Sequence, residues 1–143
     1  MGPGEVIMTE SGQVVMRSEI NPWQWSRDVP YSQAVLVEKP ERILYCSGHT
    51  AIGPDGAPPA ILDTVGQVEI AMANLAITLE QAGMAFANIV KLTVFTTAID
   101  DLFPRWAPIA DRLAPNVPAA TLVGITRLVY PELKVEIEAI AVA

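Results

Sequence analysis

Apolar residues recur at helical spacing in one long segment, residues 68–82. Steps of four and three place these residues on a single face, so we expect one face of this helix to be buried. Asp63 or Thr64 can cap its start, and Gly83 stands where a C-terminal cap is common. The pattern therefore predicts an amphipathic helix that packs on a sheet.

A second helix is predicted over residues 102–113, with Asp100 or Asp101 as its N-terminal cap. Pro104 is tolerable because it would lie in the first turn. Pro108 would remove an intrahelical hydrogen bond, so we expect a kink at this residue or a shorter helix.

Short runs rich in β-branched or aromatic residues predict strands in the rest of the chain. They cover residues 14–20, 34–38, 43–47, 88–97, 121–128 and 133–142. The Lys39-Pro40-Glu41 turn predicts an antiparallel hairpin of 34–38 with 43–47, and 88–97 is expected in the centre of a sheet. Strands with intervening helices predict an α+β fold, a mixed β-sheet with two helices packed on one face.

The length of 143 residues suits one domain with its own core. Residues 1–13 are Gly-rich and aperiodic, so we expect a flexible N-terminal segment before a single domain over residues 14–143. The composition is 51% hydrophobic, which is apolar for a protein without a membrane segment. Part of the surface is therefore expected to be covered in a homo-oligomer.

No apolar run reaches the roughly 20 residues that a spanning helix needs, and no secretion signal is evident. We expect no membrane contact and a cytoplasmic location. Nine Lys and Arg against sixteen Asp and Glu give a formal charge of −7, which weighs against nucleic-acid binding. The lone Cys46 and His49 are too few soft ligands for zinc, so we expect no metal and no cofactor; a carboxylate-only site has no support.

Five segments stand in a shared order and spacing. They are Pro30-Tyr31-Ser32-Gln33-Ala34, Ser47-Gly48, Val90-Lys91-Leu92-Thr93-Val94-Phe95, Pro118-Ala119-Ala120-Thr121 and Val135-Glu136-Ile137-Glu138-Ala139. With them the chain resembles the RidA/YjgF family of reactive-intermediate deaminases over roughly residues 30–143. The resemblance implies a chorismate-mutase-like fold and a homotrimer. Its three sheets form an inner barrel, its helices lie outside, and small-molecule pockets lie between adjacent subunits.

The resemblance also implies hydrolysis of enamines and imines to 2-keto acids and ammonia, with an arginine that clamps the substrate carboxylate. Ala120 occupies the position of that arginine, and Thr121 stands where serine is common. A substrate carboxylate would lose a charge-assisted interaction worth roughly 1.5–3 kcal/mol. Arg127 matches a second family arginine and does not replace the clamp; Arg105 and Arg112 are expected at the surface or in ion pairs.

Two further side chains match the family's site. Glu136 matches a glutamate thought to activate or orient water, although Glu136 and Glu138 could equally face solvent on one side of a strand. Tyr31 matches a tyrosine that lines the pocket, where it would hydrogen-bond a substrate or wall the cleft. Gly48 and Leu122, together with Thr121, would contribute backbone donors and acceptors.

Three other positions carry two interpretations each. His49 stands where the family often has glutamine, and it would either donate a proton or be a hydrogen-bonded surface group. Trp106 lies near a place where the deaminases present a polar residue, so it would make the pocket more apolar or pack the second helix on the sheet. Trp23 and Trp25 would cover the core or a subunit contact, or stack on a ligand.

Two functions stay open from the sequence. The first is a RidA-like enzyme that hydrolyses or tautomerises an enamine, imine or related carbonyl compound without a carboxylate, with Glu136 and Tyr31 as catalytic residues. The second is a non-catalytic homotrimer that binds a small molecule or regulates on the same scaffold. Glu136 and Tyr31 favour the first, and Ala120 favours the second.

Overall fold

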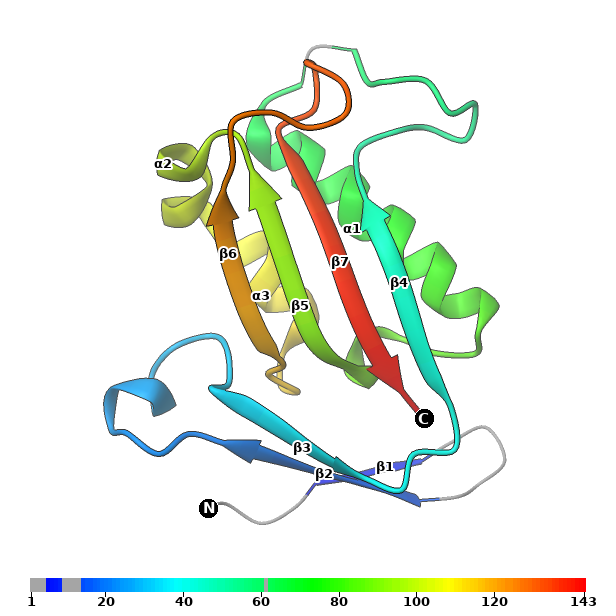
Figure 1. Ribbon diagram of the computed structural model, residues 1–143, viewed down its shortest axis with the longest axis vertical. Coiled ribbons are helices and arrows are strands. Elements are labelled where there is room, and N and C mark those ends of the chain that lie inside the picture. Colours follow the sequence, from blue (N-terminus) through cyan, green and yellow to red (C-terminus); the bar gives the residue numbers. More distant parts are fainter. Residues whose placement is uncertain (1–4, 9–13, 61) are drawn as a thin grey trace.

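A computed structural model describes residues 5–8, 14–60 and 62–143 and shows two β-sheets and one layer of helices (Figure 1). The first sheet is antiparallel, in the order β1-β2-β3: β1 is Glu5–Met8, β2 is Val14–Ile20 and β3 is Ala34–Glu38. The second has the order β4-β7-β5-β6: β4 is Ile43–His49, β5 is Ile89–Thr96, β6 is Ala119–Gly124 and β7 is Val135–Val142.

The four-stranded sheet is mixed, because β5 and β6 are parallel while β7 is antiparallel to both β4 and β5. Its helices lie on one face: α1 is Thr64–Gln81, α2 is Ile99–Leu102 and α3 is Ala107–Leu113 (Figure 1). The three-stranded sheet lies across the end of the larger sheet at which β7 finishes (Figure 1). The predicted α+β class, the mixed sheet and the central position of β5 are confirmed.

The long helix α1 has the predicted caps. The carboxylate of Asp63 accepts a hydrogen bond from the backbone N–H of Gly66 at 2.7 Å. Gly83 follows the helix with a φ of 69°, a left-handed conformation that glycine adopts without strain. The buried face of α1 includes Val68, Met72 and Leu75, which pack in the core with residues of β5 and β7.

The second predicted helix is broken. Residues 103–105 form a 3₁₀ turn between α2 and α3, and Pro104 lies in that turn. Of the two outcomes expected at Pro108, the shorter helix is found: α3 covers only Ala107–Leu113, and Pro108 lies in its first turn, where it costs no hydrogen bond. Neither aspartate acts as a cap: Ala98 is the N-cap of α2, and Asp100 and Asp101 lie in its first turn.

The predicted hairpin of 34–38 with 43–47 is wrong. β3 pairs with β2 and β4 pairs with β7, so the two strands belong to different sheets. The chain turns at Lys39, which has a φ of 51°, and Arg42 and Ala143 then exchange backbone hydrogen bonds of 2.9 and 3.0 Å. Pairing with the C-terminal strand thus takes precedence over pairing within a local turn.

Within the segment 1–13, predicted to be flexible, Glu5–Met8 forms β1 and pairs with β2. The rest of that segment, residues 1–4 and 9–13, lies outside the described residues. The strand predicted at 121–128 begins at Ala119 and ends at Gly124, and the following loop is held by the buried Gln67. Its side-chain amide bonds the backbone of Glu132 at 2.8 Å and of Lys134 at 2.7 Å.

Alternation along the strands divides the larger sheet into a face covered by helices and an open face. Val135, Ile137 and Ala139 are buried toward the helices, while Glu136 and Glu138 lie on the open face, as predicted. The open face also carries Tyr45, which is 73% exposed in the single chain. Among the described helices, none combines the length and apolarity that crossing a bilayer requires.

Candidate functional site

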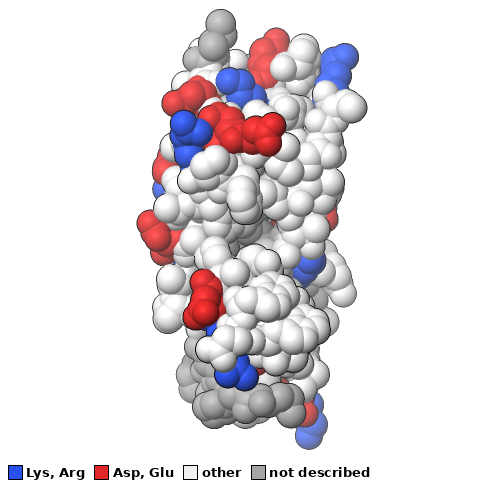
Figure 2. All heavy atoms as spheres, turned by 90° about the vertical axis from the view of Figure 1, so that its left-hand side faces the viewer, with Lys and Arg blue, Asp and Glu red and all other residues white. Residues whose placement is uncertain are grey.

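A pocket of about 630 Å³ lies between strand β6 and the broken helical segment. Its lining is mostly aliphatic or aromatic: Val29, Pro30, Tyr31, Ile99, Phe103, Trp106, Ala120, Thr121 and Leu122. None of these nine residues carries a charge. The side of the molecule with β6 and α2 has a hollow surrounded by uncharged atoms, with charged side chains above and below it (Figure 2).

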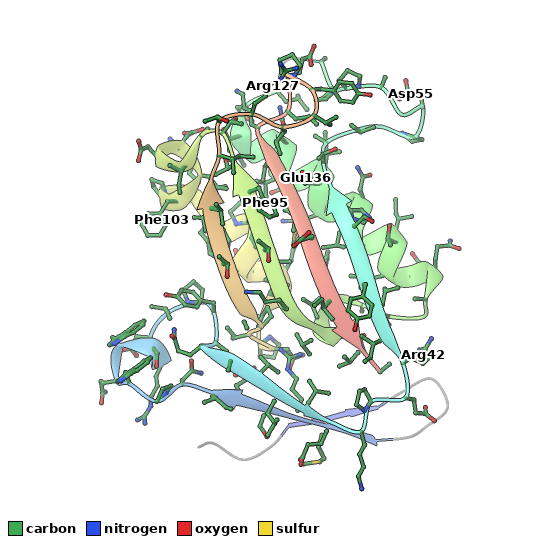
Figure 3. The ribbon with its side chains drawn as sticks, in the orientation of Figure 1. Arg42, Asp55, Phe95, Phe103, Arg127 and Glu136 are labelled. Carbon is green, nitrogen blue, oxygen red and sulfur yellow. The ribbon has the colours of Figure 1, made fainter. Side chains whose placement is uncertain are left out.

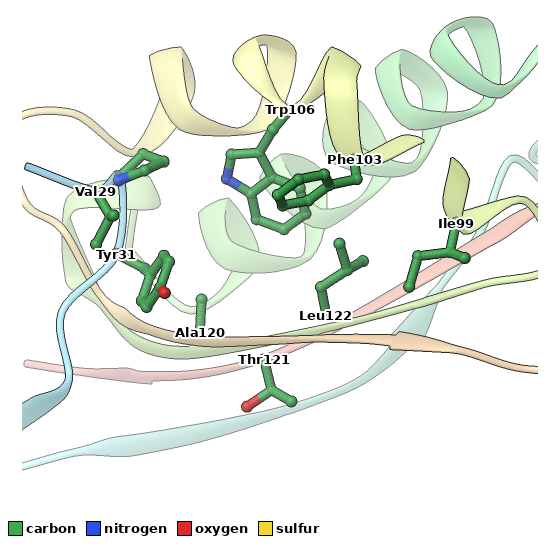
Figure 4. A pocket seen from close by; sticks show the side chains of 9 residues that line it. Val29, Tyr31, Ile99, Phe103, Trp106, Ala120, Thr121 and Leu122 are labelled. Carbon is green, nitrogen blue, oxygen red and sulfur yellow. The ribbon is translucent and has the colours of Figure 1, made fainter. Parts of the chain in front are cut away.

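Hydrogen bonds to the edge of β6 place Tyr31 in this pocket. The backbone N–H of Ser32 bonds the carbonyl of Pro118 at 2.9 Å, and the Ser32 hydroxyl bonds the carbonyl of Val117 at 2.6 Å. Ser32 also forms a parallel bridge with Ala119. Because Ser32 is thereby fixed beside the start of β6, the preceding Tyr31 lies near Ala120 (Figure 4).

The opposite wall comes from the break between the two short helices. Ile99 belongs to α2, Phe103 to the 3₁₀ turn, and Trp106 precedes α3. The Trp106 and Phe103 rings lie on the side of the pocket across from β6 (Figure 4). Phe103 is 71% exposed, so one large apolar ring stands at the mouth of the pocket.

Strand β6 contributes alternate residues to the pocket. Ala120 and Leu122 point toward Trp106 and Phe103, while the Thr121 side chain points to the other side of the strand (Figure 4). There the Thr121 hydroxyl accepts a hydrogen bond of 2.7 Å from the ammonium of Lys91. Thr121 therefore offers the pocket its backbone and not its hydroxyl.

Two polar groups lie among the apolar walls, the Tyr31 hydroxyl and the indole N–H of Trp106. Neither is hydrogen-bonded to another side chain or backbone group of the described residues. Both side chains are half-buried, so solvent or a ligand must satisfy these groups. The pocket can bind a molecule that is largely apolar and carries a hydrogen-bonding group.

Glu136 and Gly48 form a second cluster, on the open face of the sheet. A methyl group added at Gly48 would lie 2.2 Å from the Glu136 carboxylate oxygen, so a larger residue at position 48 would displace the Glu136 side chain. Glu136 lies opposite Phe95 in the register of β5 and β7, and both are drawn on the face turned away from the helices (Figure 3). Within one chain, the sheet separates Glu136 from the pocket.

His49 joins neither cluster. Its Nε2 lies 2.7 Å from the Thr78 hydroxyl of α1, and its Nδ1 lies 2.6 Å from the carbonyl of Ser47. It is paired with Ile137 in the ladder of β4 and β7, which places it on the helix side. The contacts support the interpretation of a hydrogen-bonded structural histidine.

The arginines do not supply a cation to the pocket lining. Arg105 bonds Asp101 at 2.5 Å, and Arg112 forms an ion pair with Glu69. Arg127 is exposed in the loop after β6, at the far end of the sheet from the three-stranded sheet (Figure 3). These placements agree with the surface or ion-pair roles expected for Arg105 and Arg112.

Trp23 and Trp25 stack on each other, with ring centroids 5.7 Å apart and an interplanar angle of 5°. Each is 54% exposed, so neither covers the core of the single chain. A short 3₁₀ turn that begins at Trp25 produces this stack in place of an extended strand. The interpretations as a subunit contact or a ligand platform both stay predictions.

Sequence reasoning did not find four of the lining residues, namely Val29, Pro30, Ile99 and Phe103. The sequence predicts a helix only over residues 102–113, whereas the structure has α2, a 3₁₀ turn and α3 and places Ile99 and Phe103 in the pocket lining. The described side chains include no group of three or more His, Cys, Asp or Glu placed to hold a metal.

A family model described as Endoribonuclease L-PSP matches residues 25–143. The chain belongs to the RidA/YjgF/L-PSP family. It is 36% identical over 120 residues to a RutC family protein of Pasteurella multocida. That alignment covers 79% of this chain and 87% of the relative. It is 31% identical over 113 residues to the 2-iminobutanoate/2-iminopropanoate deaminase of Homo sapiens. That alignment covers 79% of this chain and 80% of the human protein.

Solved structures of RidA/YjgF/L-PSP proteins share the fold. The Rid family protein YyfB of Yersinia pestis superposes with a TM-score of 0.79 at 30% identity, covering 89% of this chain and 98% of that one. A YjgF/YER057c/UK114 family member from Mycobacterium tuberculosis gives a TM-score of 0.62 at 26% identity, with 89% and 99% covered.

The alkylation rate of Cys46, the single cysteine of this RidA/YjgF/L-PSP protein, should depend on pH. Burial raises the pKa of the Cys46 thiol, so less reactive thiolate is present at a given pH than for a free cysteine. We expect iodoacetamide to alkylate the native protein at least about tenfold more slowly at pH 8.5 than the denatured protein, as measured by intact mass.

The rate on the native protein should rise with pH through a midpoint above that of free cysteine. The same raised pKa means that the native state loses stability as pH rises above the pKa of the unfolded thiol, since the unfolded chain then releases its proton more readily. Equal alkylation rates before and after denaturation would show that Cys46 is accessible.

Proposed function

We propose that this chain is a RidA-like enzyme for a small enamine, imine or related carbonyl compound that lacks a free carboxylate. The observation that carries the proposal is that Ala120 lies inside a pocket lined by uncharged residues. The family resemblance matches this position to the arginine that clamps the substrate carboxylate. The 2-imino acids named for the human relative each carry a carboxylate, whose burial without a cation is costly. The activity of this chain would therefore be directed to neutral substrates.

The proposed reaction is imine hydrolysis. Water forms a bond to the imine carbon, the electron pair of the C=N π bond moves to nitrogen, and nitrogen takes a proton. In the resulting carbinolamine the hydroxyl proton is transferred to the nitrogen as the C–N bond breaks and the C=O bond forms, which leaves a carbonyl compound and ammonia. Tyr31 would hydrogen-bond the reacting heteroatom, and Glu136 would accept and return the proton of water. An enamine first becomes an imine by proton transfer to carbon.

A working site of this kind needs two copies of the chain, because Tyr31 and Glu136 lie on opposite sides of the sheet. The family resemblance implies a homotrimer with pockets between adjacent subunits. In that arrangement the open face of one subunit would bring Glu136 and Gly48 to the pocket of its neighbour. The 51% hydrophobic composition and the exposed Tyr45 on the open face support such an assembly.

Ala120 also favours a second function, a homotrimer that binds a small molecule without converting it. The pocket would then serve recognition alone, and Glu136 would be an ordinary carboxylate of the sheet. Turnover distinguishes the two functions, because both predict ligand binding.

The consequence of Ala120 is testable with 2-iminobutyrate, released in situ from threonine by a dehydratase. Native protein should release 2-oxobutyrate little faster than the spontaneous rate. Ala120→Arg should raise the rate by at least about tenfold, because it restores a charge-assisted bond of roughly 1.5–3 kcal/mol. Ala73→Arg, the same change on the exposed side of α1, should leave the rate unchanged. Native activity equal to that of the human relative would show that no clamp is required.

The role of Glu136 is testable with neutral imines, released by an amine oxidase from primary amines. Native protein should accelerate carbonyl release from at least one of them, and Glu136→Gln should lower this rate about a hundredfold or more, as loss of a general base does. Glu138→Gln is the matched control, since it lies on the same strand and face, two residues along. Equal loss in both variants, or no turnover of any neutral imine by native protein, would favour the binding function.

A further inference from the structure

We propose that the pocket selects a neutral aromatic compound, with a flat ring between β6 and Trp106 and its C=N or C=O group at the Tyr31 end. This proposal deepens the proposed function, because it names the substrate class of the same pocket. It rests on that function only where it names an imine as the ligand, because conversion of an imine requires the enzyme. Binding of the corresponding carbonyl product depends on the pocket alone.

The size of the pocket exceeds the need of a short aliphatic imine. Its volume of about 630 Å³ falls in the range of sites that enclose whole small molecules. Ala120 is the smallest side chain that presents a Cβ, so β6 leaves the space in front of Trp106 open (Figure 4). A ring can fill this space and bury apolar area that an ethyl group cannot.

The walls favour a ring over a branched chain. Trp106 and Phe103 present aromatic surfaces on one side, and Ala120 and Leu122 present aliphatic groups on the other (Figure 4). Aromatic pairs gain about 0.5–1.5 kcal/mol beyond the area that they bury. A flat aromatic ligand between these walls therefore gains from both sides.

The polar groups give the ligand a direction. The hydroxyl of Tyr31 and the indole N–H of Trp106 lie toward one end, and Ile99 and Leu122 lie toward the other (Figure 4). Both polar groups can donate a hydrogen bond, and a carbonyl oxygen or imine nitrogen is an acceptor. The heteroatom would thus lie at the Tyr31 end and the ring toward the Leu122 end.

A carboxylate on the ligand would be disfavoured in this pocket. No lining residue is a cation, and Arg105, the basic residue of the neighbouring turn, is bonded to Asp101. Asp28 and Asp100 are the direct chain neighbours of the lining residues Val29 and Ile99, while the charge of Arg105, the neighbour of Trp106, is paired. A buried carboxylate would lose its hydration without gaining a partner.

Four carbonyl compounds test separately how an aromatic ring and a carboxylate affect binding. They are 4-phenylbutan-2-one, 2-oxo-4-phenylbutanoate, pentan-2-one and 2-oxopentanoate, in which a phenyl replaces a methyl and a carboxylate replaces a methyl. Binding of each is measured by titration calorimetry on the native oligomer. We expect 4-phenylbutan-2-one to bind at least tenfold more tightly than the other three compounds.

Substitutions test whether 4-phenylbutan-2-one binds in this pocket. Trp106→Ala should weaken the binding of 4-phenylbutan-2-one at least fivefold, and Trp106→Phe should largely retain it. Ile77→Ala, a change at an exposed side chain of α1 outside the pocket lining, should have no effect. Ala120→Arg should weaken 4-phenylbutan-2-one and strengthen 2-oxopentanoate. Thermal unfolding of each variant shows whether a loss of binding reflects a loss of fold, and Ala120→Arg preserves the test if Trp106→Ala does not fold.

The proposal is overturned if none of the four compounds binds, if either carboxylate binds as tightly as 4-phenylbutan-2-one, or if Trp106→Ala and Trp106→Phe both bind like native protein. Its failure is distinguishable from that of the enzyme proposal. Tight binding of 4-phenylbutan-2-one without turnover of any neutral imine would contradict only the enzyme. Turnover of aliphatic imines with no preference for the ring would contradict only the substrate class.

Discussion

The alternation of side chains along the four-stranded sheet decides on which face each candidate residue of its strands lies. Neighbouring residues of a strand point to opposite faces, and the ladders of β5 with β6 and β7 carry this assignment across the sheet. Leu122, Val94 and Ile137 share the helix face, whereas Glu136 and Phe95 share the open face. A change of register by one residue would exchange the two sets.

This constraint places the candidate residues in two clusters on opposite faces of the sheet. The helix face holds an apolar pocket with Tyr31 and Trp106, and its shape depends on Ser32, which fixes the preceding loop to the edge of β6. The open face holds Glu136 beside Gly48. The proposed reaction uses both clusters, so it would need surfaces from two copies of the chain.

The sequence predicts those features that depend on short-range pattern. The caps of α1, the central strand β5 and the facing of Glu136 follow from spacing and from the preferences of single residues. The pairing of β3 and β4 does not, because the partner of β4 is the C-terminal strand, about a hundred residues away. The helix break is predicted only in part. Pro108 indicates a kink or a shorter helix, but the prolines do not predict that Ile99 and Phe103 line a pocket.

For the site, the family resemblance predicts Tyr31, Ala120, Trp106 and Leu122 as neighbours, and the pocket contains all four. His49 is directed to Thr78 instead, because the irregularity between Cys46 and His49 in β4 places it opposite Ile137 on the helix side. Matching single residues to the family does not show that the sheet separates Glu136 from Tyr31, because this depends on how the chain folds.

The central claim, that the pocket and Glu136 of one site come from different copies, is tested most directly with mixed oligomers. Glu136→Gln and Trp106→Ala subunits are unfolded, mixed in equal amounts and refolded together, and turnover of a neutral imine is compared with that of each variant alone. If subunits mix at random in a trimer, about a quarter of the sites regain a native pocket and a native Glu136, and activity should return to that extent. No gain over the two separate variants would contradict the account, because it would place both residues in one copy.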